Sequence, residues 1–465
     1  MSAIRFGTDG WRDVIAENYT FANVRRVAQA YADHLVERGA DQVVVGYDAR
    51  FLSDRFAGAA AEVLAANGLH ARLARRITPT PVTSFAVVYY GADGGVMITA
   101  SHNPPEYNGF KLKGPYGGSA TPAIVAEVEG KLDQNPPAAY RPGDHRLESF
   151  QVQKPYFDHL AGILDLEALR GFSGVLYHDA MGGAGGGWVS GLARHLDLPI
   201  EVRDLHAVPH PLFYGVNPEP IPKNLATLTA LMRNEADPTF AAVTDGDADR
   251  IGAVLAGGRY FNSHQIFAVL LRHLHRKGLK GRVVKTFSVS KVVDLLAERL
   301  GLEVLTTPIG FKYITDEFLK GDVLIGGEES GGIGVAGHLP ERDGILNAWL
   351  LLESVAVTGK SLAEQFAEIE NEVGFRHAFD RLDLRLPDLA FKERAMRDLA
   401  EPRPLAGRKV TAVEDLDGYK WHLGEDAWVL FRPSGTEPVL RIYAEAPDPE
   451  TVARILKEAR GLLGL

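Results

Sequence analysis

The chain has 465 residues, of which 46% are hydrophobic and 24% are charged, and its formal net charge at pH 7 is −10. This composition excludes an intrinsically disordered chain, and a pI near 5.9 without a basic excess argues against a nucleic-acid partner. The sequence contains no cysteine, which excludes disulfides, zinc–thiolate centres and a cysteine nucleophile.

The N-terminal segment MSAIRFGTDGWRD gives no targeting signal. It has no apolar core behind a basic start, so it does not resemble a secretory signal. No uncharged apolar run of roughly 18 residues occurs, so we expect neither a membrane span nor a membrane partner. The sequence therefore predicts a soluble, cytoplasmic protein, whose length corresponds to about three to four domains.

Apolar, β-branched runs alternate with helix-like segments over most of the chain. The runs typical of buried strands lie at 42–46, 95–100, 174–179, 240–244, 282–286 and 323–326. Helical patterns such as that of residues 56–64 separate them. Short apolar strands separated by amphipathic helices predict α/β units with mostly parallel sheets.

The connecting segments indicate where the domains divide. Residues 135–144 are rich in proline and polar side chains, as is typical of a linker, and a helix near Gln153 is expected to open a second domain. A third domain is expected to begin after Gly257-Gly258. From about residue 374 the pattern changes to strands that are predicted to pair antiparallel, followed by a final helix, with the strands expected at 380–386, 428–431 and 440–443.

We therefore expect an α/β protein with three similar domains and a smaller α+β domain at the C-terminus. The expected bounds of the four domains are 1–147, 148–256, 257–373 and 374–465.

The first loop that carries residue types suited to catalysis is Thr99-Ala-Ser-His-Asn-Pro104. It directly follows a predicted strand, and α/β proteins place their sites at the carboxyl ends of strands. Ser101 in this loop is a candidate nucleophile or phosphoacceptor. An ordinary polar turn is the alternative, because serine, asparagine and proline are common turn residues.

The second loop, Asp245-Gly-Asp-Ala-Asp-Arg250, also follows a predicted strand. Its aspartates alternate along the chain, so Asp245, Asp247 and Asp249 project to one side of an extended segment. Three converging carboxylates repel one another unless a hard cation lies between them, which favours a divalent metal site. A solvated acidic turn is the alternative. An EF-hand is excluded, because Arg250 occupies its glycine position and Ala256 its final glutamate position.

Two further loops are suited to binding a sugar and an anion. The loop Gly326-Gly-Glu-Glu-Ser-Gly-Gly332 combines glycines, which allow a close backbone approach, with Glu328 and Ser330, which can bond sugar hydroxyls. The loop Arg432-Pro-Ser-Gly-Thr-Glu-Pro438 offers an arginine, hydroxyls and backbone amides to a phosphate. A flexible glycine turn and a plain hairpin turn, respectively, are the alternatives.

Together with Phe6-Gly-Thr-Asp-Gly-Trp-Arg12, these four loops resemble the α-D-phosphohexomutase family, the phosphoglucomutase/phosphomannomutase group. The resemblance covers nearly the whole chain, and the motifs occur in the family's order. It implies four domains around a central cleft, with one loop from each domain. It also implies sheets that include an antiparallel strand, so the expectation for the first three domains becomes mixed rather than mostly parallel sheets.

The resemblance implies a phosphoserine mechanism. Ser101 would carry the phosphoryl group, and Mg²⁺ would be held by an oxygen of that phosphoserine together with Asp245, Asp247 and Asp249. The phosphoryl group would pass to a hexose phosphate and give a hexose 1,6-bisphosphate, the expected activator. After this intermediate reorients, its other phosphoryl group would return to Ser101. The catalytic set implied by the family is completed by Lys111 as general acid/base, with Arg12 and His102 beside it.

The remaining implied contacts hold the substrate. Glu328 and Ser330 would bind the O3 and O4 hydroxyls, and the C-terminal loop would grip the phosphate that is not reacting. The expected substrate-binding residues are Arg250, Glu328, Ser330, Arg432, Ser434, Gly435 and Thr436. Arg342 stands where many members of the family have lysine. We expect small hexose phosphates as the binding partners, a monomer or weak homodimer, and hinge closure near residues 370–375.

Three other functions remain open on the sequence. A phosphoglucosamine mutase would use the same loops, and a metal-dependent sugar phosphatase would use the aspartate loop with water. A non-catalytic sugar-phosphate binding protein is disfavoured, because Ser101, the three aspartates and Lys111 are all present. Glucose and mannose share the configuration at C3 and C4, so turnover of both phosphates is expected.

Overall fold

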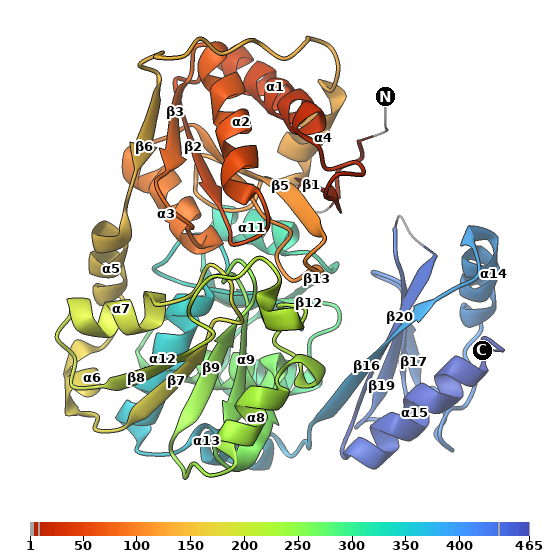
Figure 1. Cartoon of the computed structure of the whole chain (residues 1–465). Helices are drawn as coiled ribbons and strands as arrows, with labels where there is room; N and C mark the ends of the chain where they lie inside the picture. The colour runs from red at the N-terminus through yellow and green to blue at the C-terminus, as the bar shows by residue number, and fades with distance from the viewer. Residues whose placement is uncertain (1–3, 8–9, 436–437, 465) are drawn as a thin grey trace.

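The computed structural model describes residues 4–7, 10–435 and 438–464, and these residues form four sheets. Figure 1 shows the first three sheets and their helices lying close together, with the C-terminal unit, coloured blue, to one side. None of the helices within these ranges is both long and apolar enough to cross a membrane. We number the domains I to IV by their sheets.

Domain I contains a mixed sheet in the order β1-β5-β4-β2-β3-β6. Its central strands are parallel, whereas β5 runs antiparallel to both β1 and β4. The strands are β1 (Gly10–Val14), β2 (Gln42–Tyr47), β3 (His70–Ala74), β4 (Gly94–Ile98), β5 (Tyr107–Lys113) and β6 (Leu147–Phe150). The helices are α1 (Phe21–Glu37), α2 (Ser53–Ala66), α3 (Thr80–Tyr90) and α4 (Pro122–Gly130). The valines of β2 are fully buried, as expected of a parallel strand covered on both faces.

The first sheet extends past the segment expected to be a linker. Residues 135–144 form no helix or strand, but β6 follows them and pairs in parallel with β3. The helix expected near Gln153 is confirmed as α5 (Gln153–Ala161).

Domain II contains the sheet β11-β10-β9-β7-β8. The strands are β7 (Val175–Asp179), β8 (Glu201–Leu205), β9 (Phe240–Thr244), β10 (Ile251–Leu255) and β11 (Arg259–Phe261). Helices α6 (Leu166–Gly171), α7 (Trp188–His195) and α8 (Ala226–Met232) accompany them, with short 3-10 helices at Phe213–Gly215, Pro222–Asn224 and Ala256–Gly258. Because β11 pairs with β10, this sheet extends beyond the expected domain end at residue 256.

Domain III contains the sheet β13-β12-β14-β15, in which β15 is antiparallel to β14. The strands are β12 (Arg282–Thr286), β13 (Val304–Thr307), β14 (Val323–Gly327) and β15 (Ile333–Val335). The helices are α9 (Ser263–Arg276), α10 (Lys291–Arg299), α11 (Phe311–Lys320), α12 (Gly344–Thr358) and α13 (Leu362–Val373). Helix α12 begins at Asp343, whose carboxylate accepts hydrogen bonds from the amides of Ile345 and Leu346 and so caps the first turn.

Domain IV contains an entirely antiparallel sheet, β16-β20-β19-β18-β17, with its own apolar core. The strands are β16 (Ala378–Arg385), β17 (Ala412–Glu414), β18 (Tyr419–His422), β19 (Trp428–Pro433) and β20 (Val439–Ala446). The helices are α14 (Leu389–Leu399) and α15 (Pro449–Gly461). The predicted fold class, three α/β domains with mixed sheets and an α+β C-terminal domain, is confirmed.

A buried glutamate joins domain IV to domain III. Glu445 on β20 accepts hydrogen bonds from the Ser290 hydroxyl, the Lys291 amide at 3.0 Å and the Trp428 indole at 2.6 Å. Its carboxylate also lies 2.6 Å from Nδ1 of His377, which precedes β16. Helix α13 ends at Gly374 with φ of 67°, and β16 begins shortly afterwards, so the domain connection is short.

Candidate active site

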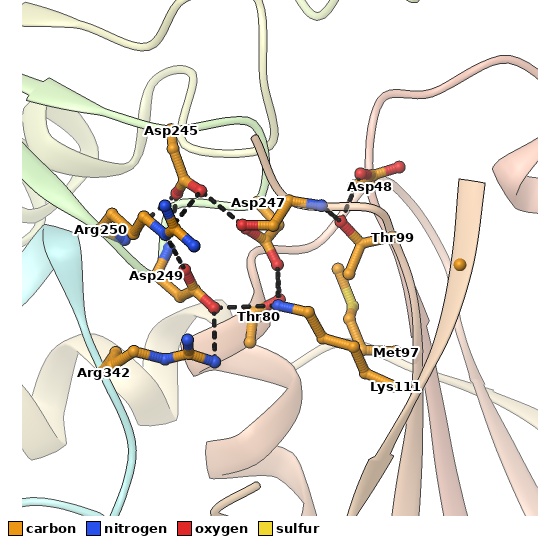
Figure 2. Close-up of polar contacts among 12 residues, drawn as sticks. Asp48, Thr80, Met97, Thr99, Lys111, Asp245, Asp247, Asp249, Arg250 and Arg342 are labelled. Atoms are coloured by element: carbon orange, nitrogen blue, oxygen red, sulfur yellow. Dashed lines mark hydrogen bonds and ion pairs between the residues drawn. The ribbon is translucent and has the colours of Figure 1, made fainter. Parts of the chain in front are cut away.

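The aspartate loop lies at the end of β9 and is fully buried. Asp245, Asp247 and Asp249 each have 0% exposure, and one ligand oxygen from each lies within 4.8 Å of the others. Figure 2 shows the three carboxylates turned toward one another, with Lys111 and Arg342 beside them. The alternative of a solvated acidic turn is therefore wrong.

Three cations surround the aspartates. Lys111 Nζ donates to Asp247 Oδ2 at 2.8 Å and to Asp249 Oδ2 at 3.0 Å. Arg342 Nη2 lies 2.9 Å from Asp249 Oδ2, and Arg250 Nε lies 3.9 Å from both Asp245 and Asp249. Each of the three residues comes from a different domain, so the charge balance of the loop depends on domains I, II and III together.

The pKa values of the aspartates move apart because of these neighbours. Burial raises the pKa of Asp245 well above its ordinary value, and the charges of Asp247 and Asp249 add to the effect. Burial would raise the pKa of Asp249 too, but Arg342, Lys111 and Arg250 outweigh it and lower that pKa. Asp247 Oδ1 and Asp249 Oδ1 are buried without a hydrogen-bond partner among the described residues. Such carboxylate oxygens fit a hard divalent cation such as Mg²⁺.

Ser101 lies directly against this loop. Its hydroxyl donates to Asp245 Oδ2 at 2.7 Å, and the residue is 1% exposed. Its backbone is left-handed, with φ of 52°, and its amide donates to Thr99 Oγ1 at 2.9 Å. The structure thus brings together the serine of domain I and the aspartates of domain II, which are more than a hundred residues apart in the sequence.

Two residues at this junction were not found by sequence reasoning. Thr80, at the start of α3, donates from its hydroxyl to Asp247 Oδ2 at 2.6 Å and from its amide to the Asp247 carbonyl at 2.9 Å. Gly246 approaches the serine loop so closely that a Cβ there would lie 2.4 Å from the Ser101 carbonyl oxygen. The Thr80-Pro81 pair, which is typical of a helix start, was the available signal for Thr80.

A cleft of about 780 Å³ opens beside the serine and aspartate loops and is lined by all four domains. Of the predicted site residues, its walls contain Arg12, His102, Arg250, Glu328, Ser330, Arg432 and Ser434. Further cations in the walls, which sequence reasoning did not single out, are Arg5, Lys223, Arg381 and Arg441. The cleft therefore suits an anionic ligand with several polar groups.

The sugar loop follows β14 and is tied to the aspartate loop. The Ile251 amide donates to the Gly331 carbonyl at 3.0 Å, and Arg250 pairs with Gly332 in an isolated bridge. Glu328 Oε2 lies 3.8 Å from Nη1 of Arg342, which also contacts Asp249. Burial raises the pKa of Glu328 to about 7, although Arg342 opposes that shift. Arg342 therefore connects the aspartate loop to the sugar loop.

The C-terminal loop reaches the cleft from domain IV. Arg432 Nε donates to Asp417 Oδ2 at 3.0 Å, and the same oxygen accepts from the Ile309 amide of domain III at 2.9 Å. Lys392 Nζ donates to the Ser434 carbonyl at 2.6 Å. Gly435 is exposed beside them, and Thr436 lies outside the described residues.

Arg12 and His102 line the cleft beside the serine loop. Arg12 Nη1 donates to Asn103 Oδ1 at 3.1 Å. Desolvation lowers the pKa of His102 well below its ordinary value, and the charges of Arg250 and Arg12 act in the same direction. His102 is therefore neutral at pH 7 and can both donate and accept a hydrogen bond.

A buried hydroxyl facing three carboxylates, at the edge of a cleft rich in arginine, has the parts that metal-assisted phosphoryl transfer needs. The comparison with known families agrees with this class of enzyme. Three parts of the chain match the phosphoglucomutase/phosphomannomutase alpha/beta/alpha domains I, II and III, at residues 3–138, 154–258 and 262–373 respectively. A fourth part, residues 392–462, matches the C-terminal domain of the same family. The chain belongs to the phosphoglucomutase/phosphomannomutase family and is a phosphohexomutase, an intramolecular phosphotransferase.

Relatives in the family differ in the sugar that their names give. A Thermococcus kodakarensis phosphoglucomutase/phosphomannomutase is 31% identical over 461 residues, covering 97% of this chain and 96% of the relative. A protein of the same organism assigned as a phosphoglucosamine mutase is 32% identical over 460 residues, covering 98% of both. The crystal structure of a Thermus thermophilus protein assigned as a phosphomannomutase is 52% identical, with a TM-score of 0.91 over 100% of both chains.

Proposed function

We propose that this enzyme interconverts the 1-phosphates and 6-phosphates of glucose and mannose through a phosphoserine at Ser101 and a hexose 1,6-bisphosphate. The observation that carries the proposal is the 2.7 Å hydrogen bond from the Ser101 hydroxyl to Asp245, at the edge of a cleft built by four domains. A phosphatase in which a metal at the aspartates activates water for direct attack would not need a serine hydroxyl in this position.

The proposed roles follow from the contacts. In the forward step the phosphorus–oxygen bond to Ser101 Oγ breaks as a new bond forms from phosphorus to the oxygen of a sugar hydroxyl. The sugar hydroxyl gives its proton to a general base, and Ser101 Oγ takes up a proton as it leaves. Lys111, whose Nζ lies between Asp247 and Asp249, is proposed as the general acid/base: as the neutral amine it would accept the proton of the sugar hydroxyl, and as the ammonium it would return a proton to the leaving oxygen. Mg²⁺ held by the three aspartates and a phosphoserine oxygen would supply charge neutralisation for the transferring group.

The cleft residues are proposed to hold the substrate in either of its two orientations. Glu328 and Ser330 would bind the O3 and O4 hydroxyls, while Arg250, Arg12 and His102 would face the reacting phosphate. The C-terminal loop would hold the distal phosphate through Arg432, Ser434, Gly435 and Thr436. The hexose 1,6-bisphosphate would then also serve as the activator that restores a dephosphorylated enzyme.

The proposed preference for glucose and mannose rests on charge. O3 and O4 are alike in the two sugars, so contacts from Glu328 and Ser330 do not distinguish them. A glucosamine phosphate carries a cationic amine, and the cleft walls already hold many arginines. Two of the acidic side chains there, Glu219 and Asp383, are paired with Arg381 at 3.5 and 3.0 Å. We expect kcat/KM values for glucose 1-phosphate and mannose 1-phosphate within roughly 100-fold of each other, and a lower value for glucosamine phosphate.

Ser101→Ala tests the mechanism directly. Purified wild type, incubated with hexose bisphosphate, should gain a species heavier by about 80 Da, the mass of HPO₃, and Ser101→Ala should not. The variant should lose mutase activity by at least about 1,000-fold while keeping its fold. Ser354→Ala is a matched control, because Ser354 is also buried but lies in α12 and donates only to a helix carbonyl. Activity above about a tenth of wild type in Ser101→Ala would show that Ser101 is not the phosphoacceptor.

A further inference from the structure

Arg50 lies outside the walls of the cleft and has no part in the reaction steps proposed for this enzyme. It follows β2 in the segment Tyr47-Asp-Ala-Arg50 and is only 3% exposed. A buried guanidinium needs partners for its five N–H groups, because each unpaired donor would carry a desolvation cost.

Arg50 donates to four backbone carbonyls, of which three belong to the serine loop and one to Tyr107 at the start of β5. Nη2 donates to the carbonyls of Ser101 and Asn103, both at 2.6 Å. Nη1 donates to the carbonyls of Pro104 at 2.7 Å and Tyr107 at 3.0 Å. Only a planar fork with donors along two edges can hold four carbonyls at once, and lysine has no such geometry.

Asp48 also fixes the position of the serine loop. It lies 3.3 Å from Arg50 Nε and accepts a 2.6 Å hydrogen bond from Thr99 Oγ1, which in turn accepts from the Ser101 amide. The backbone amide of Ser101 is thus held through Thr99 and Asp48, and its backbone carbonyl is held by Arg50. The left-handed backbone of Ser101 is strained for a non-glycine residue and persists only when its surroundings hold it.

Domain II contacts both Arg50 and the serine loop. The Arg50 guanidinium lies 4.9 Å from the ring centre of Phe213, a fully buried residue with φ of 47°. The Ser101 carbonyl oxygen accepts a hydrogen bond from Arg50 and also lies close to Gly246 of the aspartate loop. Movement of the guanidinium would therefore alter how the serine loop meets the aspartate loop.

We propose that Arg50 is a positioning residue, which fixes the direction in which the Ser101 hydroxyl faces the aspartate loop. The inference rests on Ser101 being the phosphoacceptor, as proposed above. Arg50 itself does not line the cleft, so its loss should leave substrate binding largely intact while misplacing the reacting oxygen. A misplacement of about 1 Å can cost about 100-fold in rate.

The test compares Arg50→Lys and Arg50→Ala with Arg272→Lys and Arg272→Ala. Arg272 is also a buried arginine, 6% exposed, but it pairs with Glu368 and Glu372 far from the serine loop. We expect kcat to fall about 100-fold in both Arg50 variants with KM within about threefold, and near wild-type kinetics in both Arg272 variants. Guanidinium ion at low millimolar concentration should restore at least about a tenth of the lost kcat to Arg50→Ala and leave Arg272→Ala unchanged.

Phe213→Leu keeps the arginine and removes only the ring beneath it, so it provides a test should the Arg50 variants fail to fold. Its kcat should fall several-fold at an unchanged KM. Wild-type kcat in Arg50→Lys or Phe213→Leu, a change confined to KM, or no rescue by guanidinium would overturn the positioning role. Intact mass separates the two proposals: a wild type that never gains the phosphoryl group refutes the phosphoserine mechanism, whereas a phosphorylated Arg50→Lys with full kcat refutes only the positioning role.

Discussion

Replacing Gly246 by alanine should disable the enzyme without unfolding it. An ideal Cβ at this position would lie 2.4 Å from the Ser101 carbonyl oxygen and 3.1 Å from Cγ of Pro218. Cβ contacts below 3.0 Å are essentially never observed and ordinary contact begins at 3.4 Å, so the aspartate loop and the serine loop must move apart by at least 0.6 Å, and by 1.0 Å to reach ordinary contact. Such a displacement predicts a fall in kcat of about 100-fold, and overpacking of this kind costs about 1–3 kcal/mol of stability.

The assay is steady-state turnover of glucose 1-phosphate, combined with urea denaturation. Gly58→Ala is the matched control, because Gly58 lies inside α2 and a Cβ there would meet no atom within 4 Å. That control should keep wild-type kcat and gain about 0.5–1 kcal/mol of stability, as alanine replaces glycine in a helix. A Gly246→Ala enzyme with kcat within about threefold of wild type would refute the argument that the two loops meet at van der Waals distance.

Three further predictions concern the metal and two buried glutamates. Chelation with EDTA should abolish activity and added Mg²⁺ should restore it, because the aspartate loop is expected to hold the cation; full activity in chelator would contradict this role. Burial raises the pKa of Glu328 from 4.5 to about 7, so its stabilising contribution is complete below pH 4.5 and is lost as the pH rises through 7. Between pH 4.5 and 8, the free energy of unfolding of Glu328→Gln should therefore rise by about 3 kcal/mol relative to that of wild type. If urea titrations gave the same difference between variant and wild type at both pH values, the raised pKa of this buried carboxyl would be contradicted. Burial would raise the pKa of Glu445, but the hydrogen bond and charge of His377, aided by Ser290 and the Lys291 amide, lower it to about 2. Its contribution is present above pH 4.5 and is lost as the pH falls through 2, so Glu445→Gln should destabilise by about 3 kcal/mol at pH 7 and converge with wild type in acid. If the difference in melting temperature between Glu445→Gln and wild type did not change with pH, the lowered pKa of Glu445 would be contradicted.

Several of the strands that present the site could be predicted because they are short apolar runs, but β1 and β5, which carry Arg12 and Lys111, were not predicted. The expected strands at 240–244 and 323–326 match β9 and β14, and the loops that follow them hold the aspartates and Glu328. The loops were recognisable because their chemistry is local in sequence. The strand β11 was not predicted, because a three-residue edge strand carries too few apolar residues to form a pattern.

The supporting residues of the site could not be predicted, because their partners are distant in the chain. Thr80 meets Asp247 across 167 residues, and no spacing rule connects them. Lys113 and Glu341 form an ion pair with both side chains fully buried, which joins domains I and III, yet each resembles an ordinary surface charge in the sequence. Arg50 acts on carbonyl groups, which every residue possesses, so its partners carry no sequence signature.

If Ser101 carries a phosphoryl group as proposed, the three cations around the aspartate loop affect how the enzyme would be restored after losing that group. Lys111, Arg250 and Arg342 equal the three aspartates in number, so the unphosphorylated pocket would be close to neutral before any metal enters if all three carboxyls were ionised. A divalent ion alone leaves an excess of two positive charges, and a phosphoryl group on Ser101 brings about −1.5 to −2 at pH 7. The ion and the phosphoryl group thus raise the affinity of the pocket for each other, and this effect is reciprocal. Under the proposed mechanism, an enzyme that released its bisphosphate before the second transfer would bind Mg²⁺ more weakly, so its return to the cycle would depend on the concentration of free metal as well as on the supply of bisphosphate.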